Sequence, residues 1–272
     1  EHLVKIIGIG DNVVDKYIHM GTMYPGGNAL NIAVLCKRYG AETAYLGCLG
    51  NDYAGKHIYE SLRKEGVDVS KIRILNGENA YARVTLIDGD RTFLKGSKGV
   101  SQNIILERED YEFINKFQLV HTSIYSGIED QLSSIKKVNA KISYDFSNDY
   151  NEDYLDKALP YVDFAFFSGS SKSDDEVIKF IKEVMAYGAE LVLVTRGSKG
   201  ATLWYRDEYY NQSIVPTKVV DTLGAGDGFI SRLLLGILKN ENINETLYQS
   251  AKEAAKVCAY YGAFGYGVNI KE

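Results

Sequence analysis

The chain has 272 residues, which is long enough to bury the core of one large α/β domain or of two modest ones. Its 31 lysine and arginine residues against 36 acidic residues give a formal net charge of −5, so the composition offers no electrostatic argument for a nucleic-acid partner. The three cysteines are odd in number and contain no CxxC pair, which excludes a disulfide framework and argues against a zinc site.

The first residues, EHLVKIIGIGD, lack the basic region and the long apolar segment of a secretory signal. No apolar run elsewhere in the sequence is long enough to span a membrane. Because the cysteines also form no disulfide framework, we expect a soluble protein of the reducing cytoplasm that has no membrane partner.

Short apolar segments rich in β-branched residues recur along the chain and predict buried strands of a parallel sheet. These segments are 4–10, 43–50, 118–124, 141–146, 162–168 and 190–195. Segments with helical periodicity lie between them, and each ends in a glycine at the expected helix stop. The clearest of these are 29–40, 53–66 and 173–188. Alternation of strands and helices predicts a layered α/β fold.

Two segments break this alternation. Residues 82–96 predict a hairpin around Asp88-Gly89-Asp90, and residues 200–215 predict another around Arg206-Asp207. The first hairpin and residues 11–24 have too many polar positions for a central parallel strand, so we place them in a small lid over one edge of the main sheet. We therefore expect a single domain over 1–272, with lid segments at approximately 12–24 and 78–97.

The heptapeptide DTLGAGD, residues 221–227, directly precedes an apolar helical run, GFISRLLLGILK. Gly224, Ala225 and Gly226, here called the glycine floor, leave backbone N–H groups unshielded where the helix dipole also favours an anion. Capping of the helix would explain a lone Asp227, but not the open floor beside it. A hydroxyl that accepts a phosphoryl group needs a base and amide donors close together. The motif lacks the GK[ST] of a Walker loop.

With this motif, the sequence resembles the ribokinase-like (PfkB) family of carbohydrate kinases over essentially its whole length. Residues 221–227 fit the C-terminal signature of that family, and GGNALNIAVLCKRYGAETAYLGCLG, residues 26–50, fits the N-terminal signature. The strings IGDNVVDKY, PGGNALN and SYDFSND look closest to the fructoselysine 6-kinase branch, which acts on glycated lysine. The resemblance implies a layered α/β/α domain with a mostly parallel central sheet and a small β-sheet lid.

The resemblance also implies three groups of functional residues. Catalysis would use Asp227 as the general base and the anion hole of Gly224, Ala225 and Gly226. The sugar would contact Asp11, Asp15, Gly26, Gly27, Asn28, Asn31 and Arg83. The nucleotide would contact Ser168, Thr195, Gly197, Gly200 and Gly226.

Several of these assignments have a structural alternative. Asn31 could simply cap a helix, and the glycines of the 195–200 loop could form an ordinary tight turn. Asn28 replaces a residue that is often lysine in ribokinases, which indicates a different polar edge of the substrate. Arg83 could bind a substrate carboxylate or belong to an exposed, salt-bridged hairpin. Arg196 and Lys199 could be solvated loop charges or phosphate contacts.

Three departures from the family pattern concern metals and packing. The Asn-x-x-Glu motif that organises magnesium waters is replaced by Ser168-Gly169-Ser170-Ser171, so Asp145 is the candidate magnesium residue. Arg232 replaces a small residue of the C-terminal signature. The monovalent-cation loop of relatives would correspond to Asp221, Leu223, Val257, Tyr260 and Gly262, which leaves dependence on K⁺ open.

We therefore expect transfer of the γ-phosphoryl group of Mg·ATP to a sugar hydroxyl, specifically the 6-hydroxyl of a fructosamine such as fructoselysine. One alternative is a kinase for a plain sugar or a ribosyl compound. Another is a sugar or nucleotide sensor without turnover, which the missing Asn-x-x-Glu motif favours and the intact Asp227 opposes. The lid also offers a surface through which two copies of the chain could form a homodimer.

Overall fold

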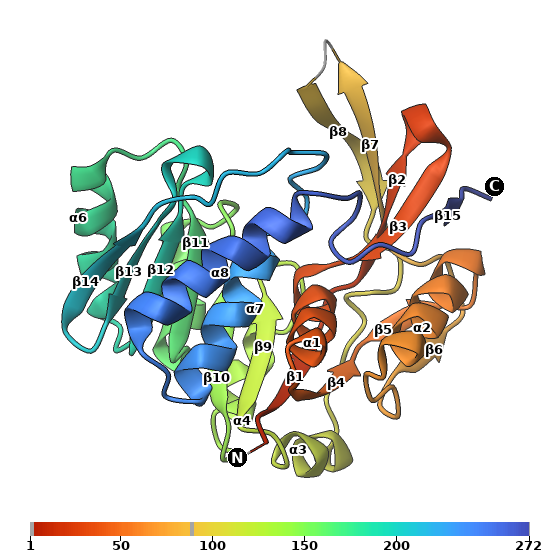
Figure 1. Ribbon diagram of the computed structural model, residues 1–272. Helices are drawn as coiled ribbons and strands as arrows, with labels where there is room; N and C mark the ends of the chain where they lie inside the picture. Colours follow the sequence, from red (N-terminus) through yellow and green to blue (C-terminus); the bar gives the residue numbers. More distant parts are fainter. Residues whose placement is uncertain (1–2, 88–89, 272) are drawn as a thin grey trace.

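The computed structural model describes residues 3–87 and 90–271, and an eight-stranded sheet forms its centre (Figure 1). The strand order is β14-β13-β12-β11-β10-β9-β1-β4. The parallel strands are β1 (Lys5–Ile9), β4 (Glu42–Leu46), β9 (Leu119–Ser123), β10 (Lys141–Asp145), β11 (Phe164–Ser168) and β12 (Leu191–Thr195). The predicted parallel strands are thus confirmed. The second predicted hairpin, β13 (Ala201–Tyr205) and β14 (Glu208–Gln212), continues the sheet in antiparallel pairing beside β12.

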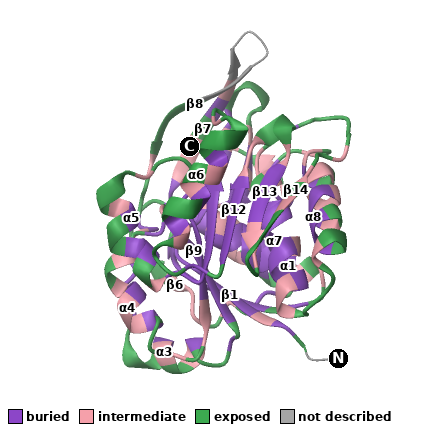
Figure 2. Ribbon diagram, turned by 90° about the vertical axis from the view of Figure 1, so that its left-hand side faces the viewer, coloured by how far each residue is buried: buried purple, intermediate pink, exposed green. Residues whose placement is uncertain are grey.

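Helices cover both faces of this sheet. One layer contains α1 (Asn28–Arg38), α7 (Ala225–Leu238) and α8 (Ile243–Val257), and the other contains α3 (Arg108–Ile114), α4 (Leu132–Ile135), α5 (Glu152–Ala158) and α6 (Asp174–Met185). Successive residues of a strand point to opposite faces. Accordingly, Ile6 packs in the first layer and Ile7 in the second. Figure 2 shows the buried strands between these helices. The predicted layered α/β/α fold is confirmed.

A second, five-stranded sheet has the order β15-β3-β2-β7-β8. Its strands are β2 (Val13–Tyr17), β3 (Thr22–Gly26), β7 (Tyr81–Ile87), β8 (Asp90–Ser97) and β15 (Val268–Asn269). Residues 11–24 and 82–96 therefore join one small sheet, although Asp88 and Gly89 of the expected turn lie outside the described residues. The sheet projects beyond the ends of the main strands (Figure 1), and the sequence did not predict β15.

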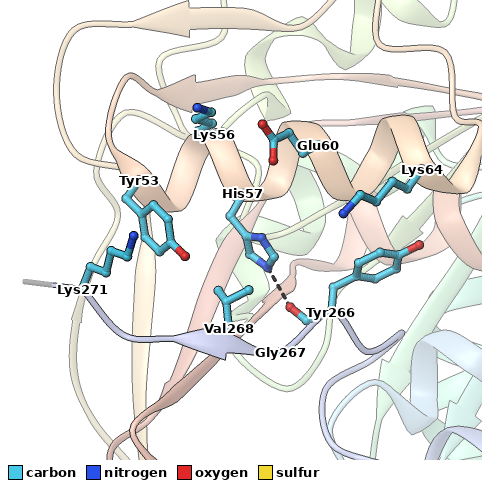
Figure 3. A pocket seen from close by; sticks show the side chains of 9 residues that line it. All are labelled: Tyr53, Lys56, His57, Glu60, Lys64, Tyr266, Gly267, Val268 and Lys271. Carbon is cyan, nitrogen blue, oxygen red and sulfur yellow. Dashed lines mark hydrogen bonds between the residues drawn. The ribbon is translucent and has the colours of Figure 1, made fainter.

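The remaining elements belong to neither of these two sheets. They are α2 (Tyr53–Glu65), the strand pair β5 (Cys48–Gly50) and β6 (Arg73–Leu75), and the short 3-10 turns Ile18–Met20, Glu129–Gln131, Leu159–Tyr161 and Gly197–Lys199. The C-terminal segment passes beside α2, where His57 Nε2 lies 2.7 Å from the carbonyl oxygen of Tyr266 (Figure 3). No helix among the described residues combines the length and the apolar character that crossing a membrane requires.

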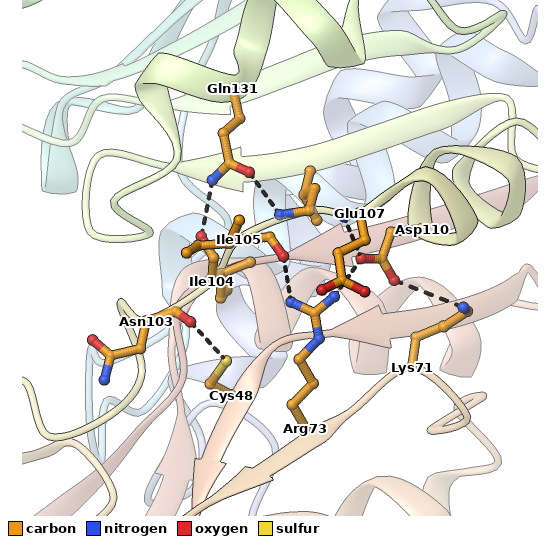
Figure 4. A network of polar contacts seen from close by, with 10 residues as sticks. Cys48, Lys71, Arg73, Asn103, Ile104, Ile105, Glu107, Asp110 and Gln131 are labelled. Carbon is orange, nitrogen blue, oxygen red and sulfur yellow. Dashed lines mark hydrogen bonds and ion pairs between the residues drawn. The ribbon is translucent and has the colours of Figure 1, made fainter.

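The long connection from β8 to α3 is held by side chains of neighbouring elements (Figure 4). Arg73 donates to the carbonyl oxygen of Ile105 at 2.6 Å and forms an ion pair with Asp110. Gln131 accepts from the amide of Leu106 at 2.7 Å and donates to the carbonyl oxygen of Ile104 at 2.9 Å. These contacts satisfy backbone groups that have no partner in a sheet, so they fix the path of the chain.

Candidate active site

The candidate site lies where the carboxyl ends of β1, β9 and β10 meet the first turns of α1 and α7. In α/β sheets, ligands bind at the carboxyl ends of the strands. Asp145 ends β10, Asn31 lies in α1, and Asp227 lies in the first turn of α7. All three side chains are buried, so the fold brings together polar groups that are far apart in the sequence.

Asp227 and Asn31 form the central contact of the site. The Asn31 amide nitrogen Nδ2 donates to Asp227 Oδ2 at 2.7 Å. Burial raises the pKa of the Asp227 carboxyl well above its ordinary value, the negative charge of Asp145 raises it further, and the hydrogen bond from Asn31 opposes the shift. A carboxylate that binds a proton more tightly than an ordinary aspartate is a better general base at neutral pH.

The glycine floor has two glycines with different structural requirements. Gly224 precedes α7 with φ 77°, and a Cβ at this position would lie 2.5 Å from Cβ of Ala263. At Gly226, by contrast, a Cβ would meet no atom of the described residues within 4 Å. The N–H groups of Gly226 and Asp227 belong to the first turn, where a helix offers no intrahelical acceptor. The surface in front of Gly226 is therefore open and lined by amide donors, which fits a phosphate group.

Asn28 connects two carboxylates at the start of α1. Its side-chain Nδ2 donates to Asp145 Oδ2 at 2.6 Å, and its backbone N–H donates to Asp11 Oδ2 at 2.6 Å. Burial raises the pKa of Asp145 to about 6, although the Ser147 amide and Asn28 act in the opposite direction. The contact with Asp145 uses only one donor of the Asn28 amide, so it does not by itself prevent Asn28 from binding a substrate.

Asp11 holds α1 against β9. Its carboxylate accepts hydrogen bonds from the backbone N–H groups of Asn28 and Ala29 and from the hydroxyls of Ser123 and Ser126, at 2.6 to 3.2 Å. The sequence did not reveal this role, because the two serines lie more than a hundred positions from Asp11. The predicted contact of Asp11 with a sugar stays a prediction.

Asp15 and Gly26 face each other across β2 and β3. A Cβ at Gly26 would lie 2.7 Å from Asp15 Oδ2 and 3.9 Å from Asn31 Oδ1, so the three residues surround one small space. Gly27 has φ 112°, and a Cβ there would lie 2.7 Å from Cα of Asn12. Among the described residues, the buried Asn31 Oδ1 has no hydrogen-bond donor. A buried acceptor without a partner is costly, so this oxygen is suited to accept from a ligand hydroxyl.

The structure does not bring Arg83 to this cluster. In the parallel pairing of β2 with β7, Asp15 is the register partner of Ala82, and Lys16 is the partner of Arg83. Because successive residues of a strand point to opposite faces, Arg83 lies on the face of the five-stranded sheet away from Asp15. Its side chain is exposed. Sequence periodicity places Tyr81 and Arg83 on one face but cannot tell which face that is.

The predicted nucleotide contacts lie together at the ends of β11 and β12. Ser168 and Thr195 are register partners, and the turn Gly197–Lys199 follows β12 directly. Gly197 has φ 56°, and Gly200 has φ 85° with the carbonyl oxygen of Gln212 only 2.1 Å from the place of a Cβ. These two glycines are therefore required by the turn itself, whatever else they do.

The basic residues of this loop have protein partners. Arg196 forms an ion pair with Asp174, and Lys199 donates to the carbonyl oxygen of Ser170 at 3.4 Å. Arg232, the unexpected residue in the signature helix, forms an ion pair with Glu241 at 2.6 Å. A Cβ at Gly236 would lie 2.4 Å from Cγ2 of Thr246 and 3.0 Å from Arg232 Nη1, so the glycine leaves room for α8 and for the Arg232 side chain.

The residues expected to hold cations are those of the predicted monovalent-cation loop and Asp145, the candidate magnesium residue. Asp221 accepts hydrogen bonds from the amides of Leu223 and Gly262, at 3.1 and 3.2 Å, and from the hydroxyl of Tyr17. Val257 ends α8, and Tyr260 donates to the carbonyl oxygen of Ala263 at 3.1 Å. No group of three or more His, Cys, Asp or Glu side chains in residues 3–87 and 90–271 is arranged to hold a metal. Asp145 therefore belongs to no such group, which fits a magnesium ion held mainly by phosphates and water.

A family model described as "pfkB family carbohydrate kinase" matches residues 4–265. A fructosamine kinase, FrlD, of Bacillus subtilis (strain 168) is 45% identical over 268 residues, which cover 97% of this chain and 94% of that protein. A fructoselysine 6-kinase of Escherichia coli (strain K12) is 34% identical over 257 residues, which cover 94% of this chain and 98% of that protein.

Solved structures agree with the fold. An Arabidopsis thaliana ribokinase complexed with ribose and ATP superposes with a TM-score of 0.82 and 21% identity, over 97% of this chain and 95% of that one. A fructokinase with bound ATP from Xylella fastidiosa superposes with a TM-score of 0.79 and 19% identity, over 96% of this chain and 94% of that one.

Proposed function

The chain belongs to the pfkB family of carbohydrate kinases, and we propose that it transfers the γ-phosphoryl group of Mg·ATP to the 6-hydroxyl of a fructosamine such as fructoselysine. The observation that carries the proposal is the buried Asp227 beside Asn31 and the open glycine floor. The fructosamine acceptor is supported by the two relatives, a fructosamine kinase at 45% identity and a fructoselysine 6-kinase at 34%.

In the proposed reaction, the Asp227 carboxylate takes the proton of the acceptor hydroxyl while the hydroxyl oxygen attacks the γ-phosphorus and ADP leaves. The amides at the start of α7 stabilise the charge on the transferred group. Asp15 and the unpartnered Asn31 Oδ1 accept hydrogen bonds from other sugar hydroxyls. Asn31 also fixes the rotamer of Asp227, so it joins sugar binding to the orientation of the base.

We also propose roles for the residues around the nucleotide. Ser168, Thr195 and the turn that begins at Gly197 would contact ATP, because they lie together at the carboxyl ends of β11 and β12. Bound Mg²⁺ would neutralise charge on the phosphates, and Asp145 would hold some of its water ligands. K⁺ would act near Asp221, whose carboxylate orders the segment before the glycine floor.

Two further properties are proposals of the same kind. A homodimer through the five-stranded sheet is supported by exposed apolar side chains on and beside it, at Ile18, Met20, Phe93 and Leu94. A location in the reducing cytoplasm is supported by Cys36, Cys48 and Cys258, which form no disulfide with each other.

The experiment that tests the function is an ADP-release assay with fructoselysine, fructose and ribose as acceptors. We expect kcat/KM to be highest for fructoselysine. Equal efficiency with ribose or fructose would contradict the fructosamine acceptor and favour a plain sugar kinase. Binding of sugar and ATP without ADP release from any acceptor in a broad panel would contradict the kinase step and favour a sensor.

A further inference from the structure

The connections that lead into and out of β2, β3, β7 and β8 run close together at the base of the five-stranded sheet. These connections are residues 10–12, residue 27, residues 76–80 and residues 98–103. A Cβ at Gly27 would lie 2.7 Å from Cα of Asn12, and the amide of Val100 donates to the carbonyl oxygen of Glu78 at 3.1 Å. Whatever fixes these connections also fixes the sheet that carries Asp15.

Two buried asparagines cross-link these connections. Asn12 and Asn79 are 2% and 1% exposed, and Asn79 Nδ2 donates to Asn12 Oδ1 at 3.0 Å. The same Nδ2 donates to the carbonyl oxygen of Ala80 at 3.1 Å, and Asn79 Oδ1 accepts from the amide of Gly50 at 3.0 Å. Exchanging the nitrogen and the oxygen of this amide would set donor against donor and acceptor against acceptor, so its orientation is defined.

Asn12 extends the network into the main sheet. Its Nδ2 donates to the carbonyl oxygen of Cys48 at 2.8 Å and to the hydroxyl of Tyr45 at 3.0 Å. The Tyr45 hydroxyl donates in turn to the carbonyl oxygen of Gly10 at 2.6 Å. Neither Asn12 nor Asn79 has a buried side-chain atom without a partner among the described residues. A buried polar network in which every group has a partner is rigid and specifies one arrangement.

The connection held by this network leads directly into the candidate site. Asp11 lies within it and accepts from the backbone N–H of Asn28 at the start of α1. Asp15 follows three residues after Asn12, in β2. The path of this connection therefore sets the distance between the five-stranded sheet and the helices that carry the proposed base. Among the described residues, the hydrogen bonds of the Asn79 side chain go to no residue of the candidate site.

We infer that Asn79 is a positioning residue for sugar binding, which acts through Asn12 to hold Asp15 at the correct distance from Asp227. The inference rests on the proposed function, in which Asp15 binds the sugar and Asp227 takes the proton. A displacement of about 1 Å between a substrate and a catalytic group can lower the rate by about a hundredfold. The proposed ATP contacts lie at β11 and β12, which β9 and β10 separate from β1. Loss of the cross-link should therefore affect the sugar more than ATP.

The variants that test this inference are Asn79→Ser, Asn12→Ser and both together. Serine is uncharged, and its single hydroxyl cannot replace all the hydrogen bonds of the amide. The control is Asp163→Ser, because Asp163 is also buried and accepts from the amide of Ile142 at 2.8 Å. Asp163 directly precedes β11, so it lies at the opposite end of the main strands from the candidate site. Calorimetry measures the affinity for fructoselysine, ADP release gives kcat and KM, and denaturant titration gives the free energy of unfolding.

We expect Asn79→Ser to weaken sugar binding and to lower kcat/KM for the sugar by about tenfold or more, with KM for ATP changed by less than about twofold. Asn12→Ser should act in the same direction. The double variant should resemble the more impaired single variant, because both substitutions remove the contact between the two amides. Asp163→Ser should lose stability and keep its sugar affinity.

Unchanged sugar affinity in a folded Asn79→Ser variant would overturn the inference, and so would an equal loss of affinity in an equally destabilised Asp163→Ser variant. If Asn79→Ser does not fold, Asn12→Ser decides by the same criteria. If neither folds, the network serves folding alone and the inference is overturned. Sugar binding without ADP release by the unsubstituted protein would contradict the proposed kinase step, and the sugar affinities of the variants would still decide the inference. Absence of sugar binding by the unsubstituted protein would overturn both.

Discussion

The amide of Asn31 donates to the carboxylate of Asp227 across 2.7 Å, and the carbonyl oxygen of the same amide has no donor among the described residues. One side chain in α1 therefore orients the proposed base and offers an acceptor to the sugar. The arrangement explains why the base and the sugar contacts come from opposite ends of the sequence.

Asp227→Asn should lower kcat by about 10²–10⁴-fold with little change in KM, because the amide cannot accept the hydroxyl proton. The raised pKa of Asp227 means that its ionisation destabilises the folded state as the pH rises through that pKa. The neutral amide should therefore leave the melting temperature at neutral pH unchanged or higher. Asp11→Asn is the control, and it should lower stability, because an amide nitrogen in place of Oδ2 cannot accept the hydrogen bond that the Asn28 N–H donates at the start of α1. Near-full turnover by Asp227→Asn would remove Asp227 from the mechanism.

Asp145→Asn should move the acid limb of the pH profile of kcat/KM to lower pH at saturating Mg²⁺. The negative charge of Asp145 raises the pKa of Asp227, so removing it lets Asp227 ionise in more acidic solution. Asp149→Asn removes an exposed charge four residues away and should leave the profile in place. An acid limb that does not move in Asp145→Asn would show that the two carboxyls are not coupled during catalysis.

Asp145 also contributes to stability of the free protein. Because its folded-state pKa is raised to about 6, its favourable contribution is complete below its ordinary pKa and is lost as the pH rises to about 6. Denaturant titrations should show a fall in the free energy of unfolding across that window, of at most about 3 kcal/mol, which Asp145→Asn abolishes. A fall of the same size in the variant would assign the effect to other groups.

Substitutions of the two glycines in the glycine floor should have different effects, one on stability and the other on activity. Gly224→Ala should lower the free energy of unfolding by about 2–4 kcal/mol, because φ 77° is unfavourable for alanine and the new methyl group overlaps Ala263. Gly226→Ala should stabilise the protein by about 0.5–1 kcal/mol, because alanine favours the helix. The same variant should lower kcat/KM for ATP by about tenfold or more, because its methyl group faces the phosphate. A fully active Gly226→Ala variant would show that phosphate does not bind at this floor.

Asp15→Ala should raise KM for the sugar by about 10–150-fold, the equivalent of a charge-assisted hydrogen bond worth about 1.5–3 kcal/mol. Arg83→Ala should change kcat/KM for fructoselysine by less than about twofold, because the side chain lies on the other face of the sheet and is exposed. A selective loss of fructoselysine turnover in Arg83→Ala would mean that the five-stranded sheet presents its other face to the substrate during catalysis.

The sequence predicted the strands and helices of the layered fold better than the contacts between individual side chains. Buried strands and glycine-terminated helices such as 53–66 are local patterns, and the structure confirms them. Contacts such as Asn28 with Asp145 join residues 117 positions apart, and no local pattern encodes them. The position of Arg83 shows the same limit. The sequence indicates that Arg83 and Tyr81 lie on one face of a strand, but which face of the five-stranded sheet this is depends on the pairing of β2 with β7. The strand β15 has only two residues, which is too short for a periodic signal.

The pairing of β3 with β15 joins residues 22–23 to residues 268–269. During synthesis, β3 emerges from the ribosome long before β15, because most of the described residues lie between the two strands. The five-stranded sheet therefore remains incomplete, with β3 lacking one partner, until the residues of β15 have been made. An unpaired edge strand can associate with other chains, so expression yield should be sensitive to chaperone supply and to changes near residue 268.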